Sequence, residues 1–249
     1  MKSEKAKKSK TILETWGISA EYLTEVVSGN PSLRGMMVGY IAERKLHDVF
    51  ESSGRVSALR KDDDHDRTRK GDLVIAYKGF EFKIEVKSLQ TNQVEIFHKG
   101  QWIPRAQKIR VAACGGNKAK YRYVPNPEFL AIPYKERLAA QYRGAVQCDA
   151  SDKRDVTLRN GKTFSTTCLL VGEFDILAAG LFGFRECWDF GFALNRSLPL
   201  SRARGYPPKV QEQLLATLMP VTWPLSAPYA TDPFALLDQL VREKRRKKP

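Results

Sequence analysis

Residues 72–88, DLVIAYKGFEFKIEVKS, constrain the fold more than any other stretch of this chain. Apolar side chains alternate with polar or small ones over two runs, Asp72–Tyr77 and Phe80–Ser88, which Lys78-Gly79 separates. This pattern predicts a β-hairpin with a two-residue turn. The register that follows pairs Tyr77 with Phe80, Ile75 with Phe82 and Leu73 with Ile84. One face of the hairpin is then wholly apolar, which opposes a one-residue slip.

The opposite face of the hairpin gathers acidic and basic residues. In this register Asp72 lies directly across from Glu85, and cross-strand partners have Cβ atoms about 4.5–5.5 Å apart. Two carboxylates that close repel each other unless a cation lies between them. Lys87 follows two residues later and projects from the same face. Carboxylate oxygens suit Mg²⁺, which activates a bound water and stabilises charge on a phosphate. The pattern therefore predicts a metal site at Asp72 and Glu85, with Lys87 orienting the attacking water.

An ordinary amphipathic strand remains an alternative explanation of the same residues. Glu-x-Lys occurs twice, at Glu81–Lys83 and at Glu85–Lys87, and such alternation is also typical of a solvent-facing strand. Only the second pair faces an acidic residue in the predicted register. We therefore take Glu85 and Lys87, rather than Glu81 and Lys83, as the candidate site.

The rest of the chain mixes helical and strand patterns, which predicts an α/β fold with a central mixed β-sheet flanked by helices. Glycines and prolines punctuate the pattern, as at Gly54 after the clearest helix, 33–51. The other predicted helices are 11–28, 134–142, 208–219 and 233–244. The other predicted strands are 55–60, 94–97, 156–158, 163–167, 174–182 and 188–194.

The net charge of +14 suggests a polyanionic partner, but its distribution weakens that inference. Residues 1–10 carry +4 and residues 242–248 carry +5, so these two segments hold +9 of the total. We predict a disordered basic tail at 1–10, a single domain at 11–240 and a basic tail at 241–249. The tails either act as solvated ends or hold phosphate backbone without sequence preference.

Several classes of protein are disfavoured by the sequence. No run of about 18 apolar residues is present, so no transmembrane helix is expected, and the basic N-terminus is unlike a signal peptide. A cytoplasmic protein follows by default. The cysteines at 114, 148, 168 and 187 form no CxxC pair, so we expect free thiols and no structural zinc.

The order of these features resembles the PD-(D/E)XK nuclease superfamily of restriction-endonuclease-like proteins, whose core runs α-β-β-β-α-β. The residues that carry the resemblance are Gly39–Glu43 in the helix, Gly71-Asp72 at a strand start and Glu85-Val86-Lys87. The usual proline before the aspartate is Gly71 here, a position that supplies no ligand. The resemblance covers 33–97 well and 145–195 loosely, which places the core at about 33–195. It leaves 98–145 as a possible insertion or specificity element and 208–244 as a C-terminal helical extension.

The resemblance implies a catalytic set and a cofactor. Asp72 and Glu85 hold Mg²⁺, with Mn²⁺ as a substitute ion, Lys87 assists catalysis, and Glu43 joins the metal site directly or through water. Glu43 also has a structural explanation, an ion pair with a basic residue at the edge of the core.

The implied function is hydrolysis of phosphodiester bonds in double-stranded DNA, as in a type II restriction enzyme. Cutting both strands favours a homodimer. The alternatives are a DNA-binding protein on a nuclease-like fold that does not cut, and a repair or recombination nuclease. Candidate DNA contacts are Arg67, Arg69 and Lys70 before the first strand, which fit a solvated loop equally well, and Ser88 and Gln90 after Lys87.

Overall fold

The computed structural model describes residues 9–61, 72–111, 120–159 and 161–247. Contacts between Cα atoms group the chain into two compact units, Met1–Ile41 and Ala42–Pro249. The predicted loop 61–71, apart from Lys61, and most of the predicted tail 1–10 lie outside the described residues.

The N-terminal unit is helical. Its elements are α1 (Ile12–Trp16), α2 (Ala20–Gly29) and the start of α3 (Pro31–Ser52), which continues into the larger unit. The helical stretch predicted over 11–28 is present as two helices with a break at 17–19. Gly17 adopts φ 64°, a left-handed conformation that ends α1, and the Ser19 side chain caps the next helix by accepting from the backbone N–H of Tyr22.

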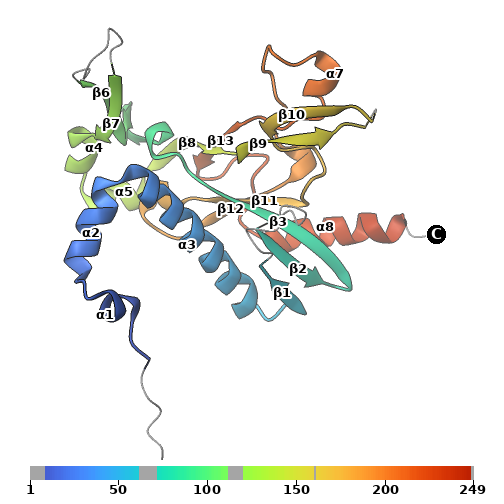
Figure 1. Cartoon of the computed structure of the whole chain (residues 1–249), viewed down its shortest axis with the longest axis horizontal. Helices are drawn as coiled ribbons and strands as arrows, with labels where there is room; N and C mark the ends of the chain where they lie inside the picture. The colour runs from blue at the N-terminus through green and yellow to red at the C-terminus, as the bar shows by residue number, and fades with distance from the viewer. Residues whose placement is uncertain (1–8, 62–71, 112–119, 160, 248–249) are drawn as a thin grey trace, which may run out of the picture. The chain divides into compact units, whose positions relative to one another are not determined.

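A mixed sheet forms the centre of the larger unit (Figure 1). Its five strands lie in the order β1-β2-β3-β11-β12, in which β3 and β11 are parallel and every other neighbouring pair is antiparallel. The strands are β1 (Ala58–Arg60), β2 (Leu73–Tyr77), β3 (Phe80–Ser88), β11 (Ile176–Gly180) and β12 (Phe190–Leu194). The predicted α/β class with a central mixed sheet is confirmed.

Helices cover one face of this sheet. Ala42, Leu46 and Phe50 of α3 are fully buried against it, together with apolar residues of α8 (Pro233–Arg246). Phe50 and Phe234 meet edge to face with ring centroids 5.8 Å apart. The apolar side of the predicted hairpin, from Leu73 to Val86, faces this core.

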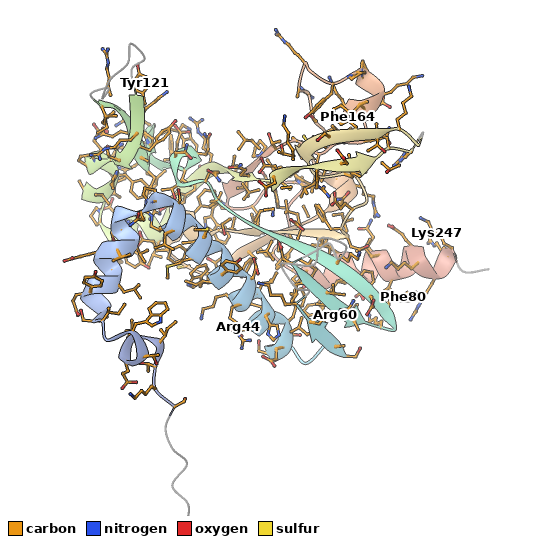
Figure 2. The ribbon with its side chains drawn as sticks, viewed as in Figure 1. Arg44, Arg60, Phe80, Tyr121, Phe164 and Lys247 are labelled. Carbon is orange, nitrogen blue, oxygen red and sulfur yellow. The ribbon has the colours of Figure 1, made fainter. Side chains whose placement is uncertain are left out.

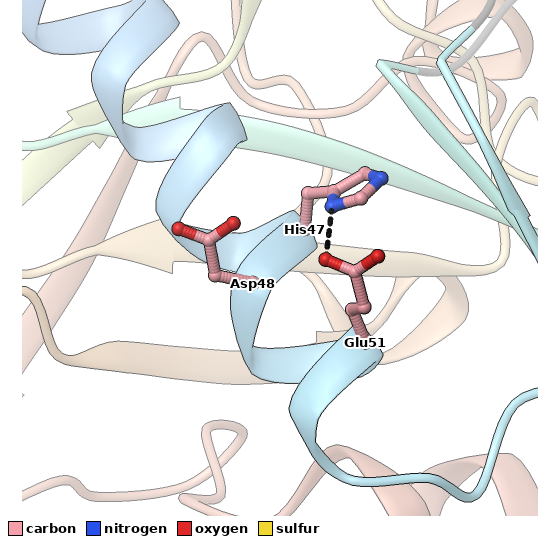
Figure 3. A group of neighbouring side chains, drawn as sticks. All are labelled: His47, Asp48 and Glu51. Atoms are coloured by element: carbon pink, nitrogen blue, oxygen red, sulfur yellow. Dashed lines mark ion pairs between the residues drawn. The ribbon is translucent and has the colours of Figure 1, made fainter. Parts of the chain in front are cut away.

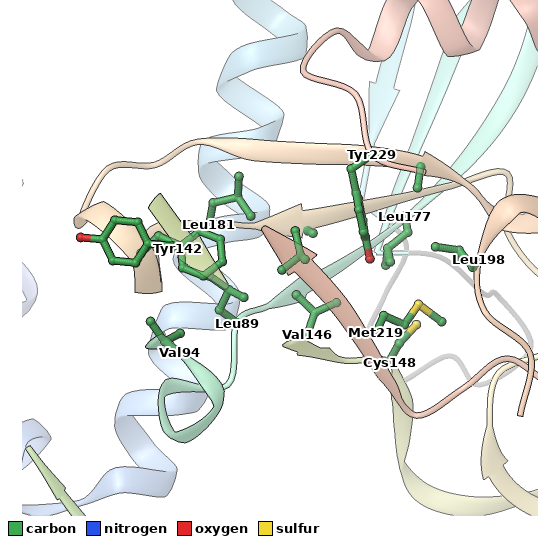
Figure 4. Close-up of a cluster of buried hydrophobic side chains, with 14 of the residues drawn as sticks. Leu89, Val94, Tyr142, Val146, Cys148, Leu177, Leu181, Leu198, Met219 and Tyr229 are labelled. Carbon is green, nitrogen blue, oxygen red and sulfur yellow. The ribbon is translucent and has the colours of Figure 1, made fainter. Parts of the chain in front are cut away.

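The opposite face of β11 and β12 packs on a second sheet. That sheet has the order β13-β8-β4-β5, and its strands are β13 (Leu218–Trp223), β8 (Gln141–Gln147), β4 (Glu95–His98) and β5 (Gln101–Pro104). Leu177 and Ala179 contribute from β11 to the shared core, which includes Val146, Cys148 and Met219 (Figure 4). The stretch 98–145 therefore supplies two strands of this sheet, β5 and β8.

The helix predicted over 208–219 is wrong. Only α7 (Pro208–Gln211) is helical there, and the chain then extends into β13. Leu214 and Leu215 are fully buried, and the backbone N–H of Leu215 donates to the Leu169 carbonyl at 2.8 Å. Pairing with distant segments thus overrides the local helical pattern.

The smaller elements complete the larger unit. They are η1 (Thr91–Gln93), β6 (Ala106–Val111), β7 (Lys120–Pro125), α4 (Pro127–Ala131), α5 (Tyr134–Ala139), β9 (Asp149–Thr157), β10 (Thr163–Cys168), α6 (Phe182–Arg185) and η2 (Asn195–Ser197).

The described part of the C-terminal basic segment belongs to the last helix, which extends two residues beyond its predicted end at 244. Helix α8 continues to Arg246, and within it Val241 is buried. Lys244 donates from Nζ to the Glu81 carbonyl at 2.8 Å, and Glu243 pairs with Arg196. Among the described helices, none is long and apolar enough to cross a membrane. Cys148, Cys168 and Cys187 are free thiols, as predicted, and Cys114 lies outside the described residues.

Candidate active site

The predicted hairpin register is confirmed. Tyr77 pairs with Phe80, and Leu73 pairs with Ile84 at the other end of the ladder. Lys78 and Gly79 have φ values of 50° and 81°, so both central residues of the turn are left-handed, as a type I′ turn requires. Glu81 faces Ala76.

Asp72 precedes β2 and lies beside β3. Its Oδ2 atom accepts a hydrogen bond from the backbone N–H of Val86 at 2.7 Å. This bond fixes the Asp72 carboxylate next to Glu85, the residue before Val86. The Asp72–Glu85 juxtaposition that the register predicts is present in the structure.

The surroundings of Glu85 shift the pKa of its carboxyl. Burial, and next the charge of Asp72, raise the pKa of the Glu85 carboxyl from 4.5 to about 7, while Lys87 opposes the rise. The Glu85 side chain is 12% exposed and that of Lys87 is 23% exposed. A carboxyl whose pKa is raised beside a second carboxylate is an arrangement that a bound cation would stabilise.

Lys87 completes the group on the same face of β3. Its Nζ atom lies 2.7 Å from Oε1 of Glu85. Burial lowers the pKa of Lys87, but the charges of Glu85 and Asp72, with the hydrogen bond to Glu85, outweigh burial and hold it above its usual range. Lys87 therefore remains a cation and a hydrogen-bond donor at neutral pH.

These three residues lie at a boundary on their face of the sheet. Toward the turn, Glu81 and Lys83 are exposed, whereas Leu177, which pairs with Glu85 across the parallel ladder, is fully buried. On this face of the central sheet, the second sheet covers strands β11 and β12. The carboxylates are thus shielded on one side and open on the other, which strengthens charge interactions while leaving access for a substrate.

Cys148 belongs to the surroundings of Lys87, and Tyr229 lies near Cys148; sequence reasoning missed both. Cys148 is fully buried, and burial raises the pKa of its thiol to about 12 although the positive charge of Lys87 opposes that rise. Tyr229 lies in the same cluster (Figure 4), and burial raises its pKa. A neutral thiol therefore lies beside the lysine, and the neutral Tyr229 phenol lies near that thiol. No local sequence signal marks them, because they reach the site from distant segments.

Glu173 is a further acid that sequence reasoning missed. Its charge contributes to the raised pKa of Glu85. Its side chain is 7% exposed and accepts two hydrogen bonds from the Arg154 guanidinium at 2.5 and 2.6 Å. Asp175, two residues on, accepts from the backbone N–H of Lys83 at 2.8 Å and so fixes this loop against β3.

A pocket of about 340 Å³ opens beside the candidate site. Val74 and Lys83, which face each other across the hairpin, line it together with Glu173 and Asp175. Val74 and Lys83 are each two residues from Asp72 and Glu85 respectively, so they lie on the same face as the carboxylates. The pocket therefore lies next to the carboxylates along the strands, but Asp72, Glu85 and Lys87 are not among its lining residues.

Glu43 has the partner that its structural explanation requires. Its carboxylate pairs with Lys61 at 2.6 Å, and its side chain is 18% exposed. Lys61 follows β1, so this pair ties α3 to the edge of the sheet. A role for Glu43 in the metal site stays a prediction.

The candidate DNA contacts are only partly described. Arg67, Arg69 and Lys70 lie outside the described residues. Ser88 ends β3 and pairs with Gly180, and the backbone N–H of Gln90 donates to the Ala145 carbonyl at 3.0 Å. Both side chains are half-buried. Their contact with DNA stays a prediction.

A second group of potential metal ligands lies on α3. His47, Asp48 and Glu51 approach one another on the helix surface (Figure 3), and His47 pairs with Glu51 at 3.7 Å. Asp48 already pairs with Arg44 at 3.0 Å, four residues earlier. Ion pairs at this spacing are ordinary on exposed helices, so the group gives no indication of a metal.

Comparison with known proteins gives no match to the chain, whether with family models, with curated proteins or with solved structures.

Proposed function

We propose that the chain is a divalent-metal-dependent DNA endonuclease with a restriction-endonuclease-like core of the PD-(D/E)XK type. The observation that carries the proposal is the placement of Asp72 beside Glu85, with Lys87 paired to Glu85 on the same face. The Glu85–Lys87 ion pair and the Val86–Asp72 hydrogen bond stabilise each carboxylate, but the two carboxylates still repel each other. They suit a site built for a cation and an anionic substrate.

The strand order supports this assignment. Helix α3 is followed by the antiparallel strands β1, β2 and β3, and β11 then adds parallel to β3. This agrees with the α-β-β-β-α-β order of that superfamily in its strands. It departs between β3 and β11, where the chain builds the second sheet and short helices.

The residues fit a hard divalent cation. Asp72 and Glu85 offer oxygen ligands, and the raised pKa of Glu85 shows the electrostatic cost that a cation would remove. Mg²⁺ bound there, or Mn²⁺ in its place, would supply Lewis-acid activation of water and of the scissile phosphate.

The chain's own residues have defined tasks in this proposal. The Val86 N–H holds the Asp72 carboxylate in place, and Lys87 Nζ donates toward the attacking water and the developing phosphorane charge. Because the Cys148 thiol beside Lys87 has a raised pKa, it offers no negative charge that would compete with Glu85 for the lysine.

The test is cleavage of supercoiled plasmid in Mg²⁺. Wild-type protein should nick and linearise the plasmid, EDTA should stop the reaction, and Lys87→Ala should lose at least about 100-fold in rate. Lys83→Ala is the matched control, because Lys83 lies on the same strand and face without contacting the carboxylates, and it should cut nearly normally. Equal rates for the two lysine variants would refute the assignment.

A type II restriction role is the biological setting we favour, with a homodimer cutting both strands of double-stranded DNA in the cytoplasm. It predicts discrete fragments with one repeated end sequence, whereas a repair or recombination nuclease would cut according to DNA structure. Sequencing the cut ends separates the two. A protein that binds DNA in Ca²⁺ but never cuts in Mg²⁺ or Mn²⁺ would instead be a DNA-binding protein on a nuclease-like fold.

A further inference from the structure

The strands β6 and β7 form a two-stranded ribbon that projects from the larger unit (Figure 1). Each strand has six residues. Together the two strands contain four basic residues and no acidic residue. The basic residues are Lys108, Arg110, Lys120 and Arg122. A strongly basic ribbon without acids is complementary to a polyanion.

One face of the ribbon has a defined composition. Lys108 pairs with Tyr123 and Arg110 pairs with Tyr121, and cross-strand partners share a face. All four side chains are exposed, with Tyr121 at 55% and Tyr123 at 49%. Figure 2 labels Tyr121 on the ribbon. Lys108 Nζ lies 4.5 Å from the centroid of the Tyr121 ring. The face therefore alternates cations and aromatic rings in open solvent. It is called the Tyr121 face below.

The ribbon is anchored firmly at its base. The backbone N–H of Arg105, the residue before β6, donates to the Val94 carbonyl at 2.8 Å, and the N–H of Asn126, the residue after β7, donates to the Arg105 carbonyl at 3.0 Å. The Arg105 guanidinium donates to the Gly183 carbonyl at 2.5 Å and to Glu186 at 2.9 Å. These bonds fix the direction in which the ribbon leaves the core.

The anchor packs on the segment that follows the candidate active-site strand. Strand β6 lies beside η1, and η1 begins at Thr91, four residues after Lys87. Val94, which accepts from Arg105, is fully buried in the core that also contains Cys148. A ligand held by the ribbon is therefore held in a fixed relation to the strand that carries Glu85 and Lys87.

We propose that the Tyr121 face of the β6–β7 ribbon is a docking surface for duplex DNA and the main source of DNA affinity outside the active site. This rests on the proposed nuclease function. A two-stranded ribbon fits the major groove, which is about 12 Å wide, and six residues extend roughly 20 Å along it. Lys108 and Arg110 meet phosphates or guanine edges, and the tyrosine rings pack on sugars while their hydroxyls donate to phosphate.

The experiment measures binding of a 30-base-pair duplex by fluorescence anisotropy in Ca²⁺ over a range of salt concentrations. The variants are Lys108→Ala/Arg110→Ala and Tyr121→Ala/Tyr123→Ala. The matched control is Arg202→Ala/Arg204→Ala, which removes the same charge from exposed residues away from the ribbon. Circular dichroism and thermal melting should show unchanged folding in all of them, because every substituted side chain is exposed.

Both ribbon variants should raise Kd about tenfold relative to the control. The Lys108/Arg110 variant should also lower the magnitude of the salt slope by roughly 0.9 for each phosphate that it no longer binds, whereas the tyrosine variant should leave the slope unchanged. Ribbon variants that match the control in both Kd and slope would overturn the proposal, as would equal competition by polyglutamate, which would indicate an acidic protein partner. Stronger competition by single-stranded DNA would overturn the duplex assignment.

The nuclease proposal and the ribbon proposal can be refuted independently of each other. If the wild type cuts plasmid while the ribbon variants bind like the control, the ribbon assignment is wrong and the nuclease stands. If the wild type binds duplex through the ribbon but never cuts in Mg²⁺ or Mn²⁺, the nuclease assignment is wrong and the docking surface stands. If the wild type binds no DNA, the docking surface is refuted.

Discussion

The carboxylate of Asp72 accepts a hydrogen bond from the backbone N–H of Val86 at 2.7 Å, and this bond holds it beside Glu85. The same geometry separates what Asp72 does for the fold from what it would do for a metal. An asparagine at this position keeps an oxygen acceptor for Val86 but loses the negative charge.

Asp72→Asn should therefore fold with a free energy of unfolding within about 1 kcal/mol of wild type and lose metal-dependent cleavage. Removing the charge should also lower the pKa of Glu85, since Asp72 is the second largest cause of its rise. The measurements are chemical denaturation, plasmid cleavage in Mg²⁺ and NMR titration of Glu85. Full cleavage by Asp72→Asn would contradict the metal site.

The two glutamates of β3 provide a direct test of register. Glu81 faces Ala76, is exposed and pairs with Arg60 at 2.6 Å, whereas Glu85 lies beside Asp72. Glu81→Gln should cut DNA nearly normally and change stability by no more than about 0.5 kcal/mol, because it removes only a surface ion pair. Glu85→Gln should not cut. Single-turnover rates at saturating Mg²⁺ distinguish the variants, and an inactive Glu81→Gln would move the candidate lysine to Lys83.

The raised pKa of Glu85 predicts how stability depends on pH. Because the folded pKa, about 7, exceeds the unfolded value of 4.5, the folded state binds the proton more tightly. The stability that Glu85 contributes is thus complete below pH 4.5 and is lost as pH rises through 7. In EDTA, the melting temperature of wild type relative to that of Glu85→Gln should decrease between pH 5 and pH 8.

Mg²⁺ should reverse this loss of stability with rising pH. Binding of Mg²⁺ requires the ionised carboxylate, so affinity should increase as pH rises from 6 to 8, with release of a proton. Calorimetry in two buffers of different ionisation enthalpy measures the proton. A pH-independent affinity would show that Glu85 does not bind the ion.

The terminal bases should contribute to affinity without sequence preference. Residues 1–10 carry +4, and Arg245 and Arg246 are exposed in the last turn of α8. Deleting 1–10, or substituting Arg245 and Arg246 with alanine, should lower the magnitude of the salt slope of DNA binding by roughly 0.9 for each phosphate that is no longer bound. The fragment pattern should stay the same, because backbone contacts do not specify sequence. An unchanged salt slope would show that these basic residues do not contact DNA phosphates.

The Arg154–Glu173 pair should be a structural requirement of the loop beside the site. Glu173 is 7% exposed and also accepts from the backbone N–H of Leu170 at 2.8 Å. Arg154→Met leaves this buried carboxylate without its cation and should lower the free energy of unfolding by about 3 kcal/mol. The double variant Arg154→Met/Glu173→Gln should recover part of the loss. Denaturation midpoints measure both, and a stable single variant would show that the pair is dispensable.

Local pattern was sufficient for the parts of the fold that pair with their sequence neighbours. The register of β2 and β3, the left-handed turn at Lys78-Gly79 and the long helix α3 followed from periodicity, because each depends on residues a few positions apart. The juxtaposition of Asp72 and Glu85 came with the register. The candidate site was predicted to that extent.

Tertiary structure decided what depends on distant pairing. Segment 208–219 has a helical pattern, yet its second half is extended because its backbone hydrogen bonds go to Leu169 and β8. Cys148 and Glu173 reach the candidate site by the same kind of pairing, from 61 and 88 residues beyond Lys87 and Glu85. Periodicity shows which side of a helix or strand is apolar. It does not specify which remote strand will pack on that side or pair with the backbone N–H and C=O groups.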